Sequence, residues 1–241
     1  MTESPLGLHA VPATFARELS LAEQDMTEDE KIALEEAVGE VITAVMRLDR
    51  SRNIHYKTLA FCTEPRRAGD VEDYIAAMPE MVHALQEPYV YMDAMVDAGG
   101  LSATPLDTEG NPVDMEAFDA APEEERADMI ADYEIAITQA GTFALSALAP
   151  AARMTAKFGE KPERYTTFLA VLDFCREPRT LAEVKRLFEE DATLNRETTV
   201  DRQPLSCDFY LSELERAGGI VWDGGWVCTD EGRAFLAAAQ A

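Results

Sequence analysis

Seven side chains in this sequence have the chemistry that metal binding or nucleophilic catalysis needs: four cysteines and three histidines. They stand at Cys62, Cys175, Cys207, Cys228, His9, His55 and His83. No two cysteines form the C-x-x-C pair of a zinc or redox site. No histidine shares a helix face with a serine, cysteine or carboxylate in a catalytic pattern. We therefore expect structural thiols in the core, no metal, no cofactor and no enzymatic activity.

Other patterns that could carry chemistry are sparse. The chain has neither a glycine-rich phosphate loop nor an H-E-x-x-H helix, and Asp128 and Asp132 are typical of a solvated helix face. Methionines gather in the first half of the chain, at Met78, Met81, Met92 and Met95. Such residues usually fill a core, and a methionine-lined pocket for a small ligand is the alternative.

The net charge of −25, from 21 basic and 46 acidic residues, restricts the classes of partner. Residues 51–152 hold 5 basic and 19 acidic residues (−14), whereas residues 153–241 hold 12 and 16 (−4). Binding to phosphates needs lysine and arginine to displace counterions, so the acidic middle of the chain disfavours nucleic acid. A solvated surface explains most of this charge, and a basic protein partner is the more specific explanation.

Length and hydropathy indicate a globular protein. With 241 residues and 47% hydrophobic content, the chain can form one or two domains with ordinary cores. Its apolar runs are far shorter than the roughly 18 residues that a membrane span needs. The first residues lack the basic and apolar regions of a secretory signal. We expect a cytoplasmic protein that has no membrane partner.

A six-residue phrase occurs twice, as Phe-Cys-Thr-Glu-Pro-Arg at 61–66 and Phe-Cys-Arg-Glu-Pro-Arg at 174–179. Later matches follow in the same order. Ala-Gly-Gly-Leu at 98–101 corresponds to Ala-Gly-Gly-Ile at 217–220, and a Thr-x-x-Gly begins at Thr138 and again at Thr229. The difference in residue number between matching positions changes along the chain, but the matches follow one another in the same order in both copies. This pattern is typical of a duplicated unit whose loops have diverged in length.

The chain is therefore expected to contain an N-terminal segment at 1–50, a first domain at 51–152 and a second domain at 153–241. Within the N-terminal segment, Thr27-Glu28-Asp29-Glu30 is a capping box that opens a helix to about Arg50. Its apolar residues recur at helical spacing, at Leu34, Val38, Val41, Ile42, Val45 and Leu48. Because this helix lies in neither copy, its apolar face is expected to pack against copy two or to form a homodimer.

Each copy predicts three helices, two strands and a closing helix, in that order. In copy one they span about 54–63, 70–78, 88–98, 101–103, 133–138 and 139–158, with a long acidic insertion between the strands. In copy two they span about 162–176, 180–190, 206–217, 220–222, 226–228 and 230–239. Asp223-Gly224-Gly225 is a strong hairpin signal, and a bend is expected at Pro150.

This order, together with Leu211…Leu214…Ala217-Gly-Gly-Ile220, a hairpin and Thr229-x-x-Gly232, resembles the winged helix-turn-helix domains of multiple-antibiotic-resistance-type repressors. The resemblance covers about 51–150 and 160–241. It implies a mainly α fold with small β-hairpin wings, in two tandem winged-helix domains preceded by a helix. Tandem acidic winged-helix pairs also occur in the B subunit of bacterial chromosome-condensation complexes, where they bind protein, but no residue motif places this chain there.

The resemblance implies DNA binding, which requires basic and polar side chains on the third helix of each domain. Copy one has no lysine or arginine between Arg67 and Arg126. Copy two presents Asp208, Glu213 and Glu215, with Arg216 only in the last turn. Copy one therefore cannot read DNA, and copy two is a weak candidate.

We therefore expect an adaptor or regulatory subunit that acts through protein–protein interaction, with a partner that could be basic. The candidate interaction surface consists of Tyr89, Tyr91, Trp222 and Trp226. The alternative is a DNA-binding transcriptional regulator that uses the second domain. Its nucleic-acid contacts would come from Arg179, Lys185, Arg186, Arg196 and Arg202.

Overall fold

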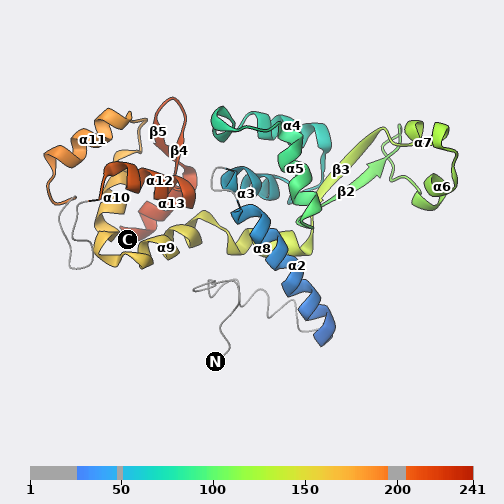
Figure 1. The fold of residues 1–241 in the computed structure, drawn as a ribbon, viewed down its shortest axis with the longest axis horizontal. Coiled ribbons are helices and arrows are strands. Elements are labelled where there is room, and N and C mark those ends of the chain that lie inside the picture. The colour runs from blue at the N-terminus through green and yellow to red at the C-terminus, as the bar shows by residue number, and fades with distance from the viewer. Residues whose placement is uncertain (1–25, 48–50, 195–204, 241) are drawn as a thin grey trace. The chain divides into compact units, whose positions relative to one another are not determined.

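The computed structural model describes residues 26–47, 51–194 and 205–240 (Figure 1). This part of the chain is mainly helical and contains two small antiparallel sheets. It divides between Ser146 and Ala147 into two compact units. We call residues 26–47 and 51–146 the N-terminal unit, and residues 147–194 and 205–240 the C-terminal unit.

The N-terminal unit contains most of the helices and the larger sheet. Its elements are α2 (Glu28–Met46), α3 (Arg52–Phe61), β1 (Arg66–Arg67), α4 (Ala68–Ala76), the 3-10 helix η2 (Pro79–His83), α5 (Pro88–Asp97), β2 (Leu101–Leu106), α6 (Met115–Ala120), α7 (Glu123–Met129), β3 (Asp132–Ile137) and α8 (Gln139–Ala147).

Helix α2 begins at the predicted capping box. The backbone N–H of Glu30 donates to Thr27 Oγ1 at 3.4 Å, and the N–H of Thr27 donates to Glu30 Oε2 at 2.7 Å. The apolar face is buried against α3 and α5, through Leu34, Val38, Val41, Ile42 and Val45. This corrects the expectation that the face packs on copy two or on a second subunit. The N-terminal unit itself covers it.

The larger sheet has the strand order β1-β3-β2, and all of its pairs are antiparallel. Strands β2 and β3 pair from Leu101 opposite Ile137 to Leu106 opposite Asp132. The hairpin is longer than the sequence predicts, because pairing continues to the edge of the acidic insertion. In Figure 1 it extends away from the helices and carries α6 and α7 at its far end.

Residues 107–131, which we call the acidic head, form a folded cap on this hairpin. They hold nine acids and a single arginine. That arginine, Arg126, donates to the carbonyls of Asp119 (2.6 Å) and Ala121 (2.9 Å), so its guanidinium closes the turn between α6 and α7. The predicted shared helix face of Asp128 and Asp132 is not formed. Asp128 lies in α7, whereas Asp132 begins β3 and pairs with Arg67 at 3.8 Å.

The C-terminal unit repeats a similar plan in fewer residues. Its elements are α9 (Pro150–Glu160), η3 (Pro162–Arg164), α10 (Tyr165–Phe174), α11 (Leu181–Glu190), α12 (Cys207–Ala217), β4 (Ile220–Trp222), β5 (Trp226–Cys228) and α13 (Asp230–Ala239). The helix expected over 139–158 is broken, because Pro150 starts α9 at its first position, where a proline N–H is not needed.

Aromatic rings form the centre of the C-terminal core. Phe158 of α9 stacks on Phe168 of α10 with ring centroids 4.6 Å apart, and Phe168 meets Tyr210 of α12 edge-on at 5.0 Å. All three side chains are buried. These rings therefore connect helices that lie far apart in the sequence of the unit. Helix α9 packs against both α12 and α13.

Candidate functional site

The repeated phrase builds the same backbone junction in both units. Cys62 ends α3 and Cys175 ends α10, with (φ, ψ) of (−87°, 12°) and (−82°, 11°). Both are fully buried. The carbonyl of Cys62 accepts from the N–H of Ile137 at 2.9 Å, and that of Cys175 accepts from the N–H of Cys228 at 2.7 Å. Each cysteine is therefore a buried residue at the end of a helix, with closely similar backbone angles in the two units.

The arginine that ends the phrase is also structural. The guanidinium of Arg66 lies 4.9 Å above the Phe61 ring, and that of Arg179 lies 4.5 Å above the Phe174 ring. Arg179 Nε donates to the Phe174 carbonyl at 3.0 Å, and the Arg179 backbone exchanges two hydrogen bonds with Trp226. Arg179, a predicted nucleic-acid contact, therefore also joins α10 to β5, and 32% of its side chain is exposed.

The Thr-x-x-Gly signature fixes the start of the closing helix. Thr229 Oγ1 donates to the Gly218 carbonyl at 2.7 Å and accepts from the Gly232 N–H at 3.0 Å. In the N-terminal unit, Thr138 Oγ1 donates to the Gly99 carbonyl at 2.6 Å and accepts from the Gly141 N–H at 3.0 Å. The repeated residues of this signature are therefore part of the scaffold and make no reactive site.

The thiols have the properties of core residues. All four cysteines are free and buried. Burial raises the pKa of Cys175 to about 12 and that of Cys62 to about 11, so both remain protonated at neutral pH. Within the described residues, no three side chains among His, Cys, Asp and Glu gather to hold a metal ion.

The two histidines in the described ranges, His55 and His83, have different environments. His9 lies outside the described residues, and His83 is exposed on η2. His55 is buried in α3, with its ring centroid 5.6 Å from that of Tyr91. Burial lowers the pKa of His55 to about 4, so the ring is neutral under ordinary conditions.

The four aromatic surface candidates fall into two pairs with different environments. On α5, Tyr89 is 49% exposed but Tyr91 is only 6% exposed, so Tyr91 is a core residue and the prediction of it as a surface contact is wrong. In the small hairpin, Trp222 and Trp226 are half-buried and meet edge-on at 5.4 Å. The tyrosine pair belongs to the N-terminal unit and the tryptophan pair to the C-terminal unit.

Few of the basic candidates remain on the surface of the described chain. Lys185 and Arg186 are exposed on α11, beside Glu189 and Glu190. Arg196 and Arg202 lie outside the described residues. Arg179 pairs with Glu183 at 4.0 Å, and the charge of Arg186 also acts on this carboxylate, so acids accompany the basic candidates that the structure describes.

Glu213 also differs from its predicted place. We expected it on the exposed face of the third helix, but its side chain is 9% exposed. Its carboxylate pairs with Lys157 of α9 at 2.7 Å and with Arg216 at 2.8 Å. The group therefore ties α12 to α9, and its charge is neutralised.

The largest apolar exposure in the described chain lies just before α5. Leu85 is 91% exposed and Val82 is 69% exposed, and the ring of Tyr89, which is 49% exposed, is the third apolar group of what we call the 82–89 segment. An ion pair of 2.6 Å between Lys57 and Glu80, whose carboxylate is 9% exposed, fixes the preceding η2 to α3. Sequence reasoning found Tyr89 but missed Val82 and Leu85. The available signal was a pair of large apolar residues, Val82 and Leu85, in a short segment between Pro79 and Pro88.

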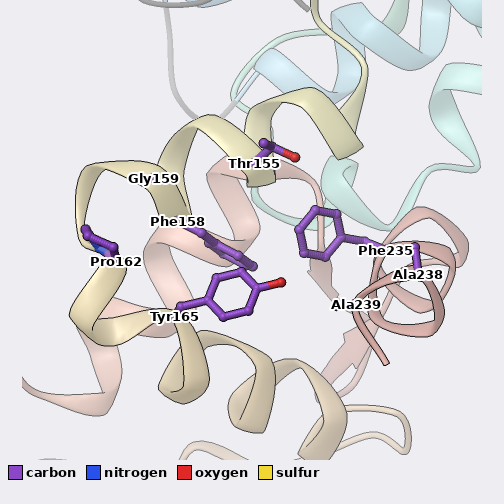
Figure 2. Close-up of a pocket in the computed structure, with 8 residues that line it drawn as sticks. All are labelled: Thr155, Phe158, Gly159, Pro162, Tyr165, Phe235, Ala238 and Ala239. Atoms are coloured by element: carbon purple, nitrogen blue, oxygen red, sulfur yellow. The ribbon is translucent and has the colours of Figure 1, made fainter. Parts of the chain in front are cut away.

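The methionines are mostly core residues. Met78, Met92 and Met95 are buried in the N-terminal unit. The pocket described below lies in the C-terminal unit, and no methionine lines it (Figure 2). The alternative of a methionine-lined ligand site therefore gains no support from the described residues.

Comparison with known proteins gave no relationship: no family model, no curated protein and no solved structure matches this chain. None of the helices in the described ranges combines the length and apolar character needed to cross a bilayer.

Proposed function

We propose that this protein is a non-enzymatic adaptor or regulatory subunit, built from two winged-helix domains, that binds a basic protein segment through the 82–89 segment. The proposal includes the cytoplasmic location expected from the sequence. The observation that carries it is the exposure of Leu85, Val82 and Tyr89 on an acidic unit.

The parallel geometry of the two units supports the winged-helix interpretation and a duplication. Within each unit, seven elements follow in the order helix, short paired segment, helix, helix, strand, strand and helix, and the N-terminal unit adds α2, η2, α6 and α7 while the C-terminal unit adds α9 and η3. In each, the paired segment begins at the arginine of the repeated phrase, with Arg66 opposite Ile135 and Arg179 opposite Trp226. Duplication of one ancestral unit explains why the same backbone pairing recurs in both units although the spacing in residue number between matching positions changes.

Exposed apolar side chains of this size favour a macromolecular partner. Monomeric proteins rarely expose several neighbouring large apolar residues, and such patches commonly mark interaction sites. In the repressors that the sequence resembles, the third helix enters the major groove of DNA. Here Tyr89 lies in the first turn of α5, and Val82 and Leu85 precede that helix, so we infer that a protein surface takes the place of the groove.

Charge specifies the chemistry of the partner. The chain has no lysine or arginine between Arg67 and Arg126, and Glu87, Asp93 and Asp97 are exposed beside the apolar residues. Lys57 of α3, which contacts η2, is paired with Glu80 at 2.6 Å. A segment that alternates basic and apolar residues would satisfy both features, whereas a nucleic acid would be repelled.

The test uses the full chain and a fluorescein-labelled 20-residue peptide that forms an amphipathic Lys/Leu helix. Anisotropy should report saturable binding that weakens with salt, and a Lys/Ser peptide of equal charge should bind less. The double variant Val82→Ser/Leu85→Ser should bind the Lys/Leu peptide about tenfold more weakly, because apolar anchors at a contact dominate affinity. Ile32→Ser on α2, where Ile32 is 49% exposed, is the matched control and should bind like wild type.

Two results would count against the proposal. Equal affinity of the wild type and the double variant would mean that the 82–89 segment is not the contact. Tighter binding to a mixed-sequence DNA duplex than to the peptide would favour a regulator that uses the second domain.

A further inference from the structure

The C-terminal unit contains a pocket between α9, the start of α10 and the end of α13. Its volume is about 550 Å³, which lies within the roughly 300–1,000 Å³ of ligand pockets. Eight residues line it: Thr155, Phe158, Gly159, Pro162, Tyr165, Phe235, Ala238 and Ala239. Figure 2 shows three aromatic rings from these three helices around one space.

The rings are arranged to receive another ring. Phe158 meets Tyr165 at 5.7 Å with an interplanar angle of 80°, and it meets Phe235 at 5.2 Å with an angle of 88°. Phe158 is buried between these neighbours, so the accessible ring surface comes from Tyr165, which is 37% exposed, and from the half-buried Phe235. A flat aromatic molecule gains favourable edge-to-face and stacked contacts in such a setting.

The lining excludes ionised ligands. None of the eight residues carries a charge at neutral pH, although the chain has a net charge of −25. Moving an ionised group from water into such a site without a partner is costly, so a neutral molecule is favoured. The pocket therefore differs in chemistry from the acidic surface proposed above to bind protein.

One polar group is available to orient a ligand. Thr155 Oγ1 donates to the Ala151 carbonyl of its own helix at 2.8 Å. The Tyr165 hydroxyl makes no hydrogen bond to any residue in the described part of the chain. It can donate to a carbonyl or ether oxygen of a molecule in the pocket.

Small side chains keep the pocket open without weakening the core. Phe158 is 2% exposed and already stacks on Phe168 at 4.6 Å, so the core beneath the pocket is complete. A Cβ built on Gly159 would meet nothing within 4 Å, and Ala238 is exposed at the rim. Because both residues line the pocket, we expect larger side chains at these two positions to occupy part of it.

We propose that the C-terminal unit binds a neutral, flat aromatic small molecule of about two fused rings in this pocket, with a hydrogen-bond acceptor directed at Tyr165. The site is independent of the 82–89 segment, which lies in the other unit.

The probe is 6-propionyl-2-(dimethylamino)naphthalene, which is neutral, has two fused rings and a carbonyl acceptor, and changes its emission in apolar surroundings. Titration of the full chain should give single-site saturation in the micromolar range with blue-shifted emission. Gly159→Leu should weaken binding at least tenfold, and Tyr165→Phe about fivefold. The matched control is Gly69→Leu in the N-terminal unit, where a Cβ likewise meets nothing within 4 Å, and it should not change the affinity.

Additional variants and a second probe test where the ligand binds and which class of ligand is preferred. Val82→Ser/Leu85→Ser should bind the probe like wild type, and the anion 8-anilinonaphthalene-1-sulfonate should bind wild type more weakly than the neutral probe. Ala238→Leu provides a second filled pocket if circular dichroism shows that Gly159→Leu is misfolded. No saturable binding, unchanged affinity in both filled variants, or a preference for the anion would each overturn the proposal.

Discussion

The backbone N–H of Cys228 donates to the carbonyl oxygen of Cys175 at 2.7 Å, and this bond links the end of α10 to the last strand of the C-terminal unit. Ile137 makes the same bond to Cys62 in the N-terminal unit at 2.9 Å. A carbonyl at a buried helix end needs a donor, and the strand supplies it. The cysteines therefore recur because a small buried residue fits this junction.

The closing helices should depend on glycine at the fourth position of Thr-x-x-Gly. A Cβ at Gly232 would overlap the carbonyl oxygen of Gly219, and one at Gly141 would overlap that of Gly100. Gly232→Ala and Gly141→Ala should each lower the free energy of unfolding of their unit by about 3 kcal/mol. Gly69→Ala, which has open space at its Cβ, should be neutral or stabilising by up to about 1 kcal/mol.

Urea unfolding can separate the two units, because both tryptophans of the chain, Trp222 and Trp226, lie in the C-terminal unit. Gly232→Ala should shift the transition followed by tryptophan fluorescence. Gly141→Ala should shift only a transition followed by circular dichroism. An unchanged midpoint in both variants would contradict the close packing of helix against carbonyl.

Acid should destabilise the N-terminal unit through His55. Its pKa in the folded chain, about 4, lies below the usual 6.5, so the unfolded chain binds more protons between these values. The stability is fully present above pH 6.5 and is lost as the pH falls toward 4, by up to about 3 kcal/mol. His55→Leu should flatten this dependence in urea titrations at pH 7.5 and 5.0. His83→Gln, which changes an exposed histidine, should keep the wild-type slope.

The carboxylate of Glu213 should stabilise the C-terminal unit more than that of Glu160, although both pair with Lys157. Glu213 Oε2 lies 2.7 Å from Lys157 Nζ with 9% of its side chain exposed, whereas the side chain of Glu160 is 62% exposed. Glu213→Gln should cost about 2 kcal/mol, because Lys157 and Arg216 lose their shared partner in a partly buried site. Glu160→Gln should cost less than about 0.5 kcal/mol. Equal shifts of the tryptophan transition would disprove this difference.

Helix α2 should act as part of the N-terminal core and not as a dimer element. Val41 is fully buried and lies close to Gly100, where a built Cβ would be 3.0 Å from Val41 Cγ1. Val41→Ser should destabilise the unit by about 3 kcal/mol, and Ile32→Ser on the exposed face should have little effect. Light scattering should give the same molar mass for both variants and the wild type. A lower mass for Val41→Ser alone would restore the dimer hypothesis.

The sequence alone determined most of the secondary structure and the internal correspondence. The capping box at Thr27, the left-handed Gly218 that ends α12 and the Asp-Gly-Gly turn all lie where the local pattern predicts. These signals work because caps and turns depend on backbone geometry within a few residues. The repeated phrase is of the same kind, since equal local sequences formed equal helix ends.

Only the tertiary structure decided which side chains face the solvent. Tyr89 and Tyr91 are two residues apart on α5, but α3 covers Tyr91 and leaves Tyr89 exposed. Arg179 and Glu213 were expected at the surface, and partners from β5 and α9 hold them in the scaffold. The aromatic pocket joins Phe158, Tyr165 and Phe235, of which the last is 70 residues beyond Tyr165. Burial and pockets depend on neighbours that are distant along the chain, so no local pattern in the sequence encodes them.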